Sequence, residues 1–129
     1  MRAVVPAGTE RSAERFGFSA AAEAAGLVFV SGVLGTAPDG SLADDPAEQL
    51  EAAFRNVGAT LTAAGTGWDR VVELTTFHVG LRAHLPAFVA EKARHVSAPY
   101  PAWTAIGVSE LAVPGAIVEI RVVAEAAAT

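Results

Sequence analysis

Short apolar runs bounded by turn residues predict strands at six places along the chain. Residues 18–25 are ambiguous, because their alanines favour a helix whereas the flanking turn signals leave room only for a short strand. As a strand they would pair with residues 27–32 in a hairpin across Ala25 and Gly26. Polar residues and turn formers predict loops at 9–17 and 36–44. The predicted strands are residues 2–5, 18–25, 27–32, 71–79 and two strands within residues 100–124, joined by a turn at Pro114 and Gly115.

The first helix is predicted to begin at Asp45, which occupies the N-cap position. Pro46 follows at the first helical position and Glu48 at the third, an arrangement typical of a capping box with an acidic first turn. The polar residues Gln49 and Asn56 are expected to face solvent or to cap neighbouring strand ends. The apolar residues recur at helical spacing and define a buried face made up of Leu50, Phe54, Val57, Leu61 and Ala64.

A second amphipathic helix is predicted after Gly80, with Pro86 near its first turn. Apolar positions again recur every three or four residues, and the proline-rich residues 97–101 end the pattern. The buried face of this helix is predicted to comprise Leu85, Phe88, Val89, Lys92, Ala93 and Val96.

The element order β-β-β-α-β-α-β-β predicts a single α+β domain over residues 1–129, with two helices on one face of a mixed sheet. Alternation along residues 71–79 places Val72, Leu74, Thr76 and His78 on one face, and Glu73, Thr75 and Phe77 on the other. Nothing in the chain covers the second face of the sheet, which includes Leu27, Phe29, Phe77 and positions of the last two strands. An uncovered apolar sheet face predicts assembly with other copies.

Composition excludes several classes of protein. The net charge of −5 argues against nucleic-acid binding, which normally needs a basic surface. The chain has no cysteine, and its three histidines match no zinc-binding spacing, so no metal site is expected. Residues 1–18 lack the apolar core of a signal peptide, and no window approaches the roughly 20 apolar residues of a membrane span. We therefore expect a cytoplasmic protein with no membrane association.

Glu119 lies in the middle of the apolar residues 116–123, and two interpretations of it are open. Alternation predicts that it shares a strand face with Arg121, so the two side chains could form an ion pair on a wet edge. Alternatively, Glu119 lies in a partly desolvated cleft, where a carboxylate can position a water molecule or accept a proton.

Other familiar signatures of catalysis are absent. The chain contains no nucleophile elbow, no phosphate-binding loop and no dinucleotide-binding fingerprint. Lys92 is the only lysine, and it could in principle form a Schiff base. Its place on an amphipathic helix favours instead a side chain whose stem covers apolar surface while its ammonium reaches water.

Several short segments form a recognisable pattern by their order and spacing: residues 18–19, 26–32, 49–56, 64–65 and 71–72, Thr75, residues 101–102 and residues 118–120. With these segments the chain resembles the RidA/YjgF family, also called the endoribonuclease L-PSP family. The resemblance covers nearly the whole chain and implies a chorismate-mutase-like α+β domain that forms homotrimers, with ligand clefts at the subunit interfaces.

The activity implied by the resemblance is hydrolysis of reactive enamines and imines, such as 2-aminoacrylate, to 2-keto acids and ammonia without a cofactor. In such proteins, a Pro-Ala-Arg motif supplies an arginine that clamps the substrate carboxylate. A glutamate, here Glu119, holds the attacking water. An aromatic residue near the N-terminus, here Phe18 in place of the usual tyrosine, and the backbone of Ser31 and Gly32 shape the rest of the cleft.

This sequence departs from that pattern at the position of the arginine, which is Trp103. A neutral indole cannot make the charge-assisted bonds of a guanidinium. Val33 replaces the glutamine that usually follows Ser-Gly, and the expected asparagine falls near Pro86 or Ala87. The resemblance also places Ala105 among the substrate-binding residues. Trp103 has a second interpretation, as a large core or interface side chain.

These observations predict a homotrimer that binds a small molecule and acts on an imine, enamine or related carbonyl by water or proton transfer, with Glu119 as the acid and base. The lost arginine favours a substrate other than an amino-acid-derived 2-imino acid. Arg121, or Arg82 or Arg94 of a neighbouring subunit, could supply a relocated positive charge. The alternatives are a non-catalytic ligand-binding or chaperone-like trimer and, on the older family name alone, a ribonuclease.

Overall fold

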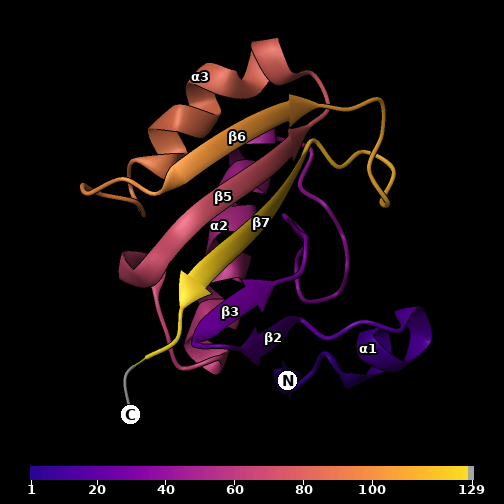
Figure 1. Cartoon of the computed structure of the whole chain (residues 1–129). Coiled ribbons are helices and arrows are strands. Elements are labelled where there is room, and N and C mark those ends of the chain that lie inside the picture. The colour runs from indigo at the N-terminus through magenta and orange to yellow at the C-terminus, as the bar shows by residue number, and fades with distance from the viewer. Residues whose placement is uncertain (128–129) are drawn as a thin grey trace.

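The computed structural model describes residues 1–127, which form a seven-stranded mixed sheet with two longer helices behind it (Figure 1). The strand order is β1-β2-β3-β7-β5-β6, and the short β4 also pairs with β7. β5 and β6 run parallel, whereas all the other neighbours are antiparallel. The strands are β1 (Arg2–Val4), β2 (Ala21–Ala24), β3 (Leu27–Val30), β4 (Val33–Leu34), β5 (Val71–His78), β6 (Ala102–Gly107) and β7 (Val118–Glu125).

The helices α2 (Pro46–Ala63) and α3 (Leu81–Lys92) lie on the same face of the sheet, as predicted (Figure 1). A single 3₁₀ turn, η1 (Trp68–Arg70), leads into β5. The predicted loop at residues 9–17 was wrong, because it contains the short helix α1 (Glu10–Phe16). Gly17, at φ 73°, ends this helix in the left-handed conformation. No residue of α1 is buried, so the sequence carries no hydrophobic stripe that would reveal it.

Local chemistry explains where α2 begins and ends. The Asp45 carboxylate accepts a hydrogen bond from the Ala47 N–H at 3.1 Å, and Pro46 follows at the first helical position. Glu48 does not complete the predicted capping box in the described part of the chain, since Asp45 alone caps the helix. Gly65, at φ 82°, follows the last turn.

The hydrophobic core lies between α2 and the sheet. Alternate residues of β7 face this helix layer and are completely or almost completely buried. Burying one such aliphatic side chain contributes about 1.5–3 kcal/mol. We call the covered side of the sheet the helix face and the other side the open face. The buried residues of β7 are Val118, Ile120, Val122 and Ala124, and the predicted α2 residues Leu50, Phe54, Val57, Leu61 and Ala64 are all buried against them or beside them.

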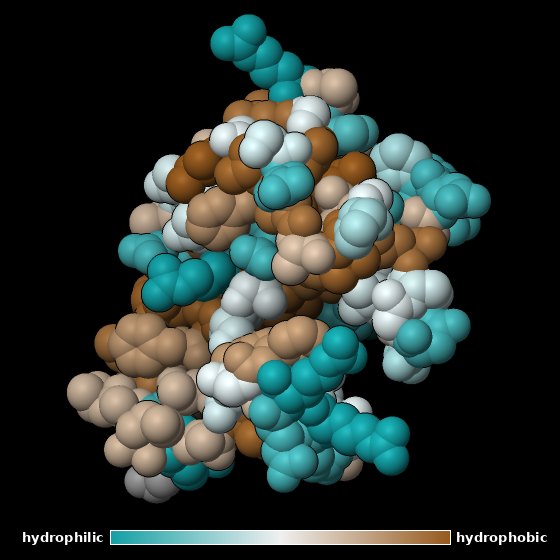
Figure 2. All heavy atoms as spheres, turned by 90° about the vertical axis from the view of Figure 1, so that its right-hand side faces the viewer, coloured by the Kyte–Doolittle hydropathy of each residue, from teal (hydrophilic) through white to brown (hydrophobic). Residues whose placement is uncertain are grey.

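The open face has no covering element in residues 1–127, which agrees with the uncovered face predicted from the sequence (Figure 1). Phe29 and Ile106 are each 39% exposed there. Figure 2 views the neighbouring edge, which carries α1 and the loop between β6 and β7, and shows hydrophobic residues exposed among hydrophilic ones. Register places these residues on the open face: Leu27, Phe29, Glu73, Thr75, Phe77, Thr104, Ile106, Glu119, Arg121 and Val123.

Two details of the predicted faces were wrong. Val72 is 41% exposed rather than turned toward the helices, because a bulge between Val71 and Glu73 breaks the alternation at the start of β5. On α3 only Phe88 is buried, whereas Val89 is 45% exposed.

The helix α3 also differs from its prediction in extent. It begins at Leu81, which places Pro86 inside the helix rather than near its start. It ends at Lys92, so Val96 is buried but lies beyond it.

The turn at Pro114 and Gly115 does not join two neighbouring strands. β5 lies between β6 and β7, so these residues belong to a longer loop that passes from one side of β5 to the other. The hairpin of β2 and β3 is as predicted. Ala25 and Gly26 both have positive φ, at 54° and 76°, the backbone of a two-residue turn that suits twisted strands.

Buried amides connect the loops around α2. The Gln49 amide donates to the carbonyls of Ala43 and Gly115, both at 3.0 Å, and accepts from the Ile117 N–H at 3.1 Å. Gln49 is therefore buried rather than solvent-facing, and of its two predicted roles the capping role is correct.

Asn56 has the same role at the end of β4, where its side chain donates to the carbonyls of Leu34 and Thr36.

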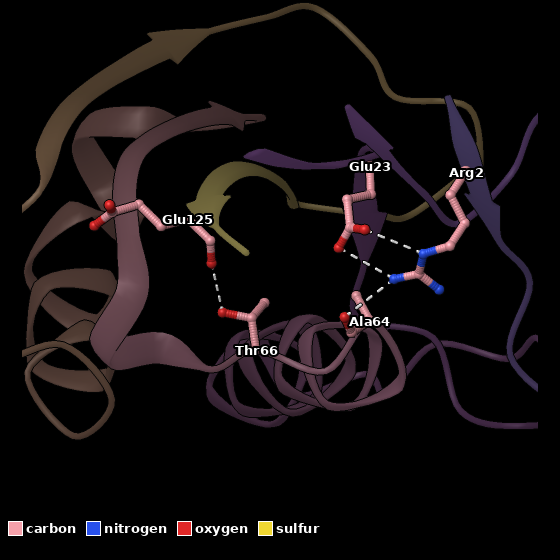
Figure 3. Close-up of polar contacts among 5 residues, drawn as sticks. All are labelled: Arg2, Glu23, Ala64, Thr66 and Glu125. Carbon is pink, nitrogen blue, oxygen red and sulfur yellow. Dashed lines mark hydrogen bonds and ion pairs between the residues drawn. The ribbon is translucent and has the colours of Figure 1, made fainter. Parts of the chain in front are cut away.

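Polar contacts also tie the far end of α2 to the sheet edge (Figure 3). The Arg2 guanidinium bonds both oxygens of Glu23 at 3.2 Å and reaches the Ala64 carbonyl at 3.4 Å. The Thr66 hydroxyl donates to the Glu125 carbonyl at 2.8 Å. In residues 1–127 no helix combines the length and apolarity that crossing a membrane requires.

Candidate functional site

Glu119 projects from β7 onto the open face, opposite Phe77 of β5 and Leu34 of β4 in the strand register. The side chain is half-buried, and it packs directly against the backbone of Gly32. A methyl group at position 32 would come within 2.6 Å of the Glu119 carboxyl carbon and 2.8 Å of one carboxylate oxygen. Only glycine therefore lets the carboxylate occupy this position.

The carboxylate of Glu119 has no hydrogen-bond or ion-pair partner among residues 1–127. Arg121 shares its face, as predicted, but is exposed and forms no ion pair with it. The interpretation of Glu119 as half of an ion pair with Arg121 was therefore wrong. A half-buried carboxylate without a partner is free to accept a proton or to orient a water molecule.

Ser31 is bonded to the segment before β2, which contains Phe18. The Ser31 hydroxyl donates to the Ser19 carbonyl at 2.7 Å, and its N–H donates to the Ala20 carbonyl at 2.9 Å. These bonds fix the segment that carries Phe18, whose side chain is 48% exposed. Val33 is different, because it pairs with the buried Ile120 and packs against the core. Its side chain therefore lies away from Glu119.

Trp103 and Ala105 lie on the helix face, not on the open face with Glu119. Trp103 pairs with the fully buried Leu74 in the register of β5 and β6, and Ala105 pairs with Thr76. The Trp103 indole stacks on Phe88, with ring centroids 5.6 Å apart. In one copy of the chain Trp103 thus packs against the core, which agrees with the second interpretation of this residue.

The sequence-predicted site residues therefore form two groups. Glu119 and Arg121, with Gly32 against the Glu119 carboxylate, belong to the open face, whereas Trp103 and Ala105 belong to the helix face. Side chains on opposite faces of one sheet cannot meet across it. A cleft that contains both groups must therefore draw them from two copies of the chain.

A buried polar chain runs behind Trp103. The Trp103 Nε1–H donates to the Thr76 hydroxyl oxygen at 3.0 Å, and the same oxygen lies 2.7 Å from Nε2 of His78. Thr76 and His78 are completely buried, and Nδ1 of His78 has no hydrogen-bond partner among residues 1–127. Burial, and secondarily the charge of His84, lowers the pKa of His78. Sequence reasoning placed these residues on one face but had no signal for the bonds between them.

Lys92 completes this region from the end of α3. Its ammonium lies 4.8 Å from the centroid of the Trp103 ring and 5.8 Å from that of Tyr100. The predicted behaviour of Lys92, a stem along apolar surface with the ammonium at its edge, agrees with this placement. Its specific contact with Trp103 was not predicted.

Two shallow hollows elsewhere on the surface do not contain these residues. One, of about 310 Å³, lies beside α2 at Glu48 and Arg55. The other, of about 430 Å³, lies between the loops that Gln49 connects. No group of three or more potential ligands among residues 1–127 could hold a metal ion.

Comparison with known proteins identifies the family. The model of the family described as "Endoribonuclease L-PSP" matches residues 9–126. The chain is 40% identical over 123 residues to the RutC family protein YjgH of Escherichia coli, covering 95% of this chain and 92% of the relative. This chain belongs to the RidA/YjgF family. The resemblance predicted from the sequence is thus confirmed.

Solved structures of RidA/YjgF proteins share the fold. A structure of the protein YJGH superposes with a TM-score of 0.89 and 36% identity, over 99% of this chain and 98% of that one. RidA from the Antarctic bacterium Psychrobacter sp. PAMC 21119 gives a TM-score of 0.78 at 29% identity, over 84% and 87% of the two chains. RidA/YjgF membership supports a role in binding small molecules or in handling reactive intermediates.

Proposed function

We propose that this RidA/YjgF protein is a homotrimer that hydrolyses a small imine, enamine or related reactive carbonyl metabolite in clefts between its subunits. The observation that carries the proposal is the Glu119 carboxylate, which is half-buried on an uncovered sheet face and has no partner in residues 1–127. A carboxylate held in this way suits general acid–base catalysis.

The proposed reaction needs only water and a proton carrier. An enamine first becomes an iminium ion when its carbon takes up a proton from solvent. Water then attacks the iminium carbon while Glu119 accepts one of its protons, giving a carbinolamine. Glu119 returns the proton to nitrogen, the carbon–nitrogen bond breaks and ammonia leaves, and the hydroxyl proton passes to solvent as the carbonyl forms. Atoms and electrons balance, and the carboxylate ends as it began.

The open face supports the trimer. Phe29 and Ile106 are exposed on it, and the site residues are divided between the two faces of the sheet. A second copy covering the open face would bury these apolar side chains and bring a helix-face group to Glu119. Each cleft would then combine Glu119 of one copy with the Trp103 region of its neighbour.

A second candidate function is ligand binding without catalysis. It is favoured by Trp103, because an indole that packs on Phe88 cannot replace the guanidinium expected at that position. A cleft of this kind could hold a ligand without activating it. The ribonuclease interpretation has no such support, since the net charge of −5 opposes it.

A coupled assay separates these functions. A dehydratase generates 2-aminoacrylate or 2-iminobutyrate, the protein is added, and keto-acid release is followed. We expect acceleration by the wild type and a loss of about a hundredfold or more in Glu119→Gln, which keeps the shape of the side chain but cannot carry the proton. Glu110→Gln removes an exposed carboxylate from the loop before β7 and serves as the control.

Two outcomes of this assay would contradict parts of the proposal. No acceleration by the wild type would contradict hydrolysis of amino-acid-derived 2-imino acids and would favour the non-catalytic binding protein. Acceleration that survives Glu119→Gln would show that another group carries the proton.

A further inference from the structure

We propose that Lys92, whose ammonium lies over the rings of Trp103 and Tyr100, binds a small carboxylate. The first observation is the position of the ammonium, 4.8 Å from the Trp103 ring and 5.8 Å from the Tyr100 ring. A cation over an aromatic face is attracted by the electron density of the ring, and tryptophan attracts it most strongly. The only lysine of the chain is thus held at one place by two rings.

The second observation is that the N–H groups of this ammonium remain free for a ligand. Within residues 1–127 Lys92 forms no ion pair and no hydrogen bond. The neighbouring Glu91 is already engaged, because its oxygens lie 3.0 Å from Nε2 of His95 and 3.6 Å from Arg94. Ring contacts satisfy the charge but not the three N–H donors. An anion can therefore bind Lys92 without displacing a protein partner.

The third observation is that the Trp103 indole, which lies against the Lys92 ammonium, is held in place. Trp103 cannot turn freely, because its Nε1–H donates to the buried Thr76 hydroxyl at 3.0 Å and its ring stacks on Phe88. Thr76 is itself held by His78 at 2.7 Å. A site that is already ordered loses little conformational entropy when a ligand binds. The buried polar chain behind Trp103 thus positions Lys92 through the indole.

The chemistry of the site favours one class of ligand. One ammonium matches the single charge of a carboxylate better than the double charge of a phosphate ester, and a charge-assisted bond to it is strong. The half-buried Trp103 and the 72% exposed Tyr100 offer aromatic surface to a flat, apolar body. A small carboxylate attached to a planar carbon meets both requirements.

This inference deepens the proposed function, because it supplies the positive charge whose loss at position 103 favoured a substrate without a carboxylate. It rests on the proposed function only for the claim that the bound carboxylate is the substrate. The binding itself does not depend on turnover, and the two can therefore fail separately.

Binding is tested by nuclear magnetic resonance on protein made with ¹³C-labelled lysine, where Lys92 gives the only lysine signal. Benzoate and 2-oxobutyrate are the probes, and benzamide is the neutral control. We expect both carboxylates, but not benzamide, to shift the Lys92 signal in a saturable way. In calorimetry, Lys92→Met should weaken benzoate binding about tenfold or more, the loss of a charge-assisted bond.

Matched variants exclude a general effect of charge. Arg55→Met removes one positive charge from α2, where the side chain is exposed, and should leave benzoate binding unchanged. Lys92→Arg keeps the charge and should retain most of the affinity. Glu119→Gln should still bind benzoate even where keto-acid release is lost. An unshifted Lys92 signal, or equal benzoate affinity of the wild type and Lys92→Met, would overturn the inference.

Discussion

Gly32 decides where the Glu119 carboxylate can lie. The Glu119 carboxylate lies against the backbone of Gly32, in the space that the side chain of any larger residue at position 32 would fill. At the scale of single residues, this steric contact limits where the Glu119 carboxylate can lie, and no polar partner in residues 1–127 adds to it. Steric contact with Gly32, rather than a hydrogen bond, therefore determines the position of the Glu119 carboxylate.

Gly32→Ala is therefore expected to impair catalysis rather than folding. The added methyl group would displace the Glu119 carboxylate by an ångström or more, and misplacement of that order costs about tenfold to a hundredfold in rate. The carboxylate is the flexible end of a half-buried side chain and can move toward solvent, so the free energy of unfolding should change little. Keto-acid release and urea unfolding are the two measurements.

Gly107→Ala is the matched control for this substitution. A methyl group there would meet only Leu81, at an ordinary 3.6 Å, so rate and stability should both be preserved. Equal rates for Gly32→Ala and the wild type would contradict the role of the contact.

At the scale of elements, β5 is the central member of the site, because it lies between the two strands that carry the site residues. Its open-face residues pair with those of β7 around Glu119, and its helix-face residues hold Trp103 of β6. The buried His78 belongs to this second group and packs edge-on against Phe88 of α3, with ring centroids 4.8 Å apart. The packing of β5, β6 and α3 against one another therefore depends on a neutral His78 imidazole.

Stability should consequently fall in mild acid. Burial lowers the pKa of His78 in the folded protein, whereas in the unfolded chain a histidine takes up a proton below a pH of about 6.5. The unfolded state then binds more protons, so the free energy of unfolding decreases as the pH drops, by at most about 1.4 kcal/mol per pH unit for this one group. Urea unfolding between pH 7.5 and 5.5 measures the slope.

The contribution of His78 is isolated by comparing two variants. His78→Gln should lose stability at neutral pH but show a shallower dependence on pH. His84→Gln removes a half-buried histidine from the same region and should keep most of the slope. Identical slopes in the wild type and His78→Gln would contradict the assignment.

Elements with strong local signals were predictable from the sequence. The cap at Asp45 and the helical spacing of Leu50 to Leu61 predicted α2, and the Ala25–Gly26 turn predicted the hairpin of β2 and β3. A single acidic residue within an apolar run indicated Glu119 as a candidate site residue. The helix α1 was missed because it buries nothing, and the bulge at Val72 was missed because alternation assumes a regular strand.

The geometry around Trp103 could not be read from the sequence for a different reason. Which face Trp103 occupies depends on its register with β5, a strand about thirty residues earlier in the chain, and on the packing of α3. The same long-range packing brings Lys92 over the indole. Local patterns carry no information about such contacts.

At the scale of the whole molecule, the open face is the surface that we propose as the subunit interface. Phe29 is 39% exposed on it, and Val89 is similarly exposed at 45% on α3, on the other side of the molecule. If the open face forms the subunit interface, a charge at position 29 should separate the subunits, because burying an unpaired carboxylate is costly. The same charge at position 89 should have no such effect.

Phe29→Asp is therefore expected to shift the mass measured by light scattering from trimer to monomer, while Val89→Asp remains trimeric. Circular dichroism checks that both variants stay folded. A monomeric wild type, or a trimer that survives Phe29→Asp, would show that the open face is not the interface.

The division of the site between the two faces of one sheet has a genetic consequence. In the proposed trimer, a chain defective at Glu119 still carries an intact Trp103–Lys92 half, and a chain defective at Lys92 still carries an intact Glu119. Two such alleles, each impaired alone, would complement each other when expressed together. With equal amounts and random mixing, about a quarter of the clefts would receive two sound halves. Activity would then depend on how the two kinds of chain assemble with each other, and not on either allele alone.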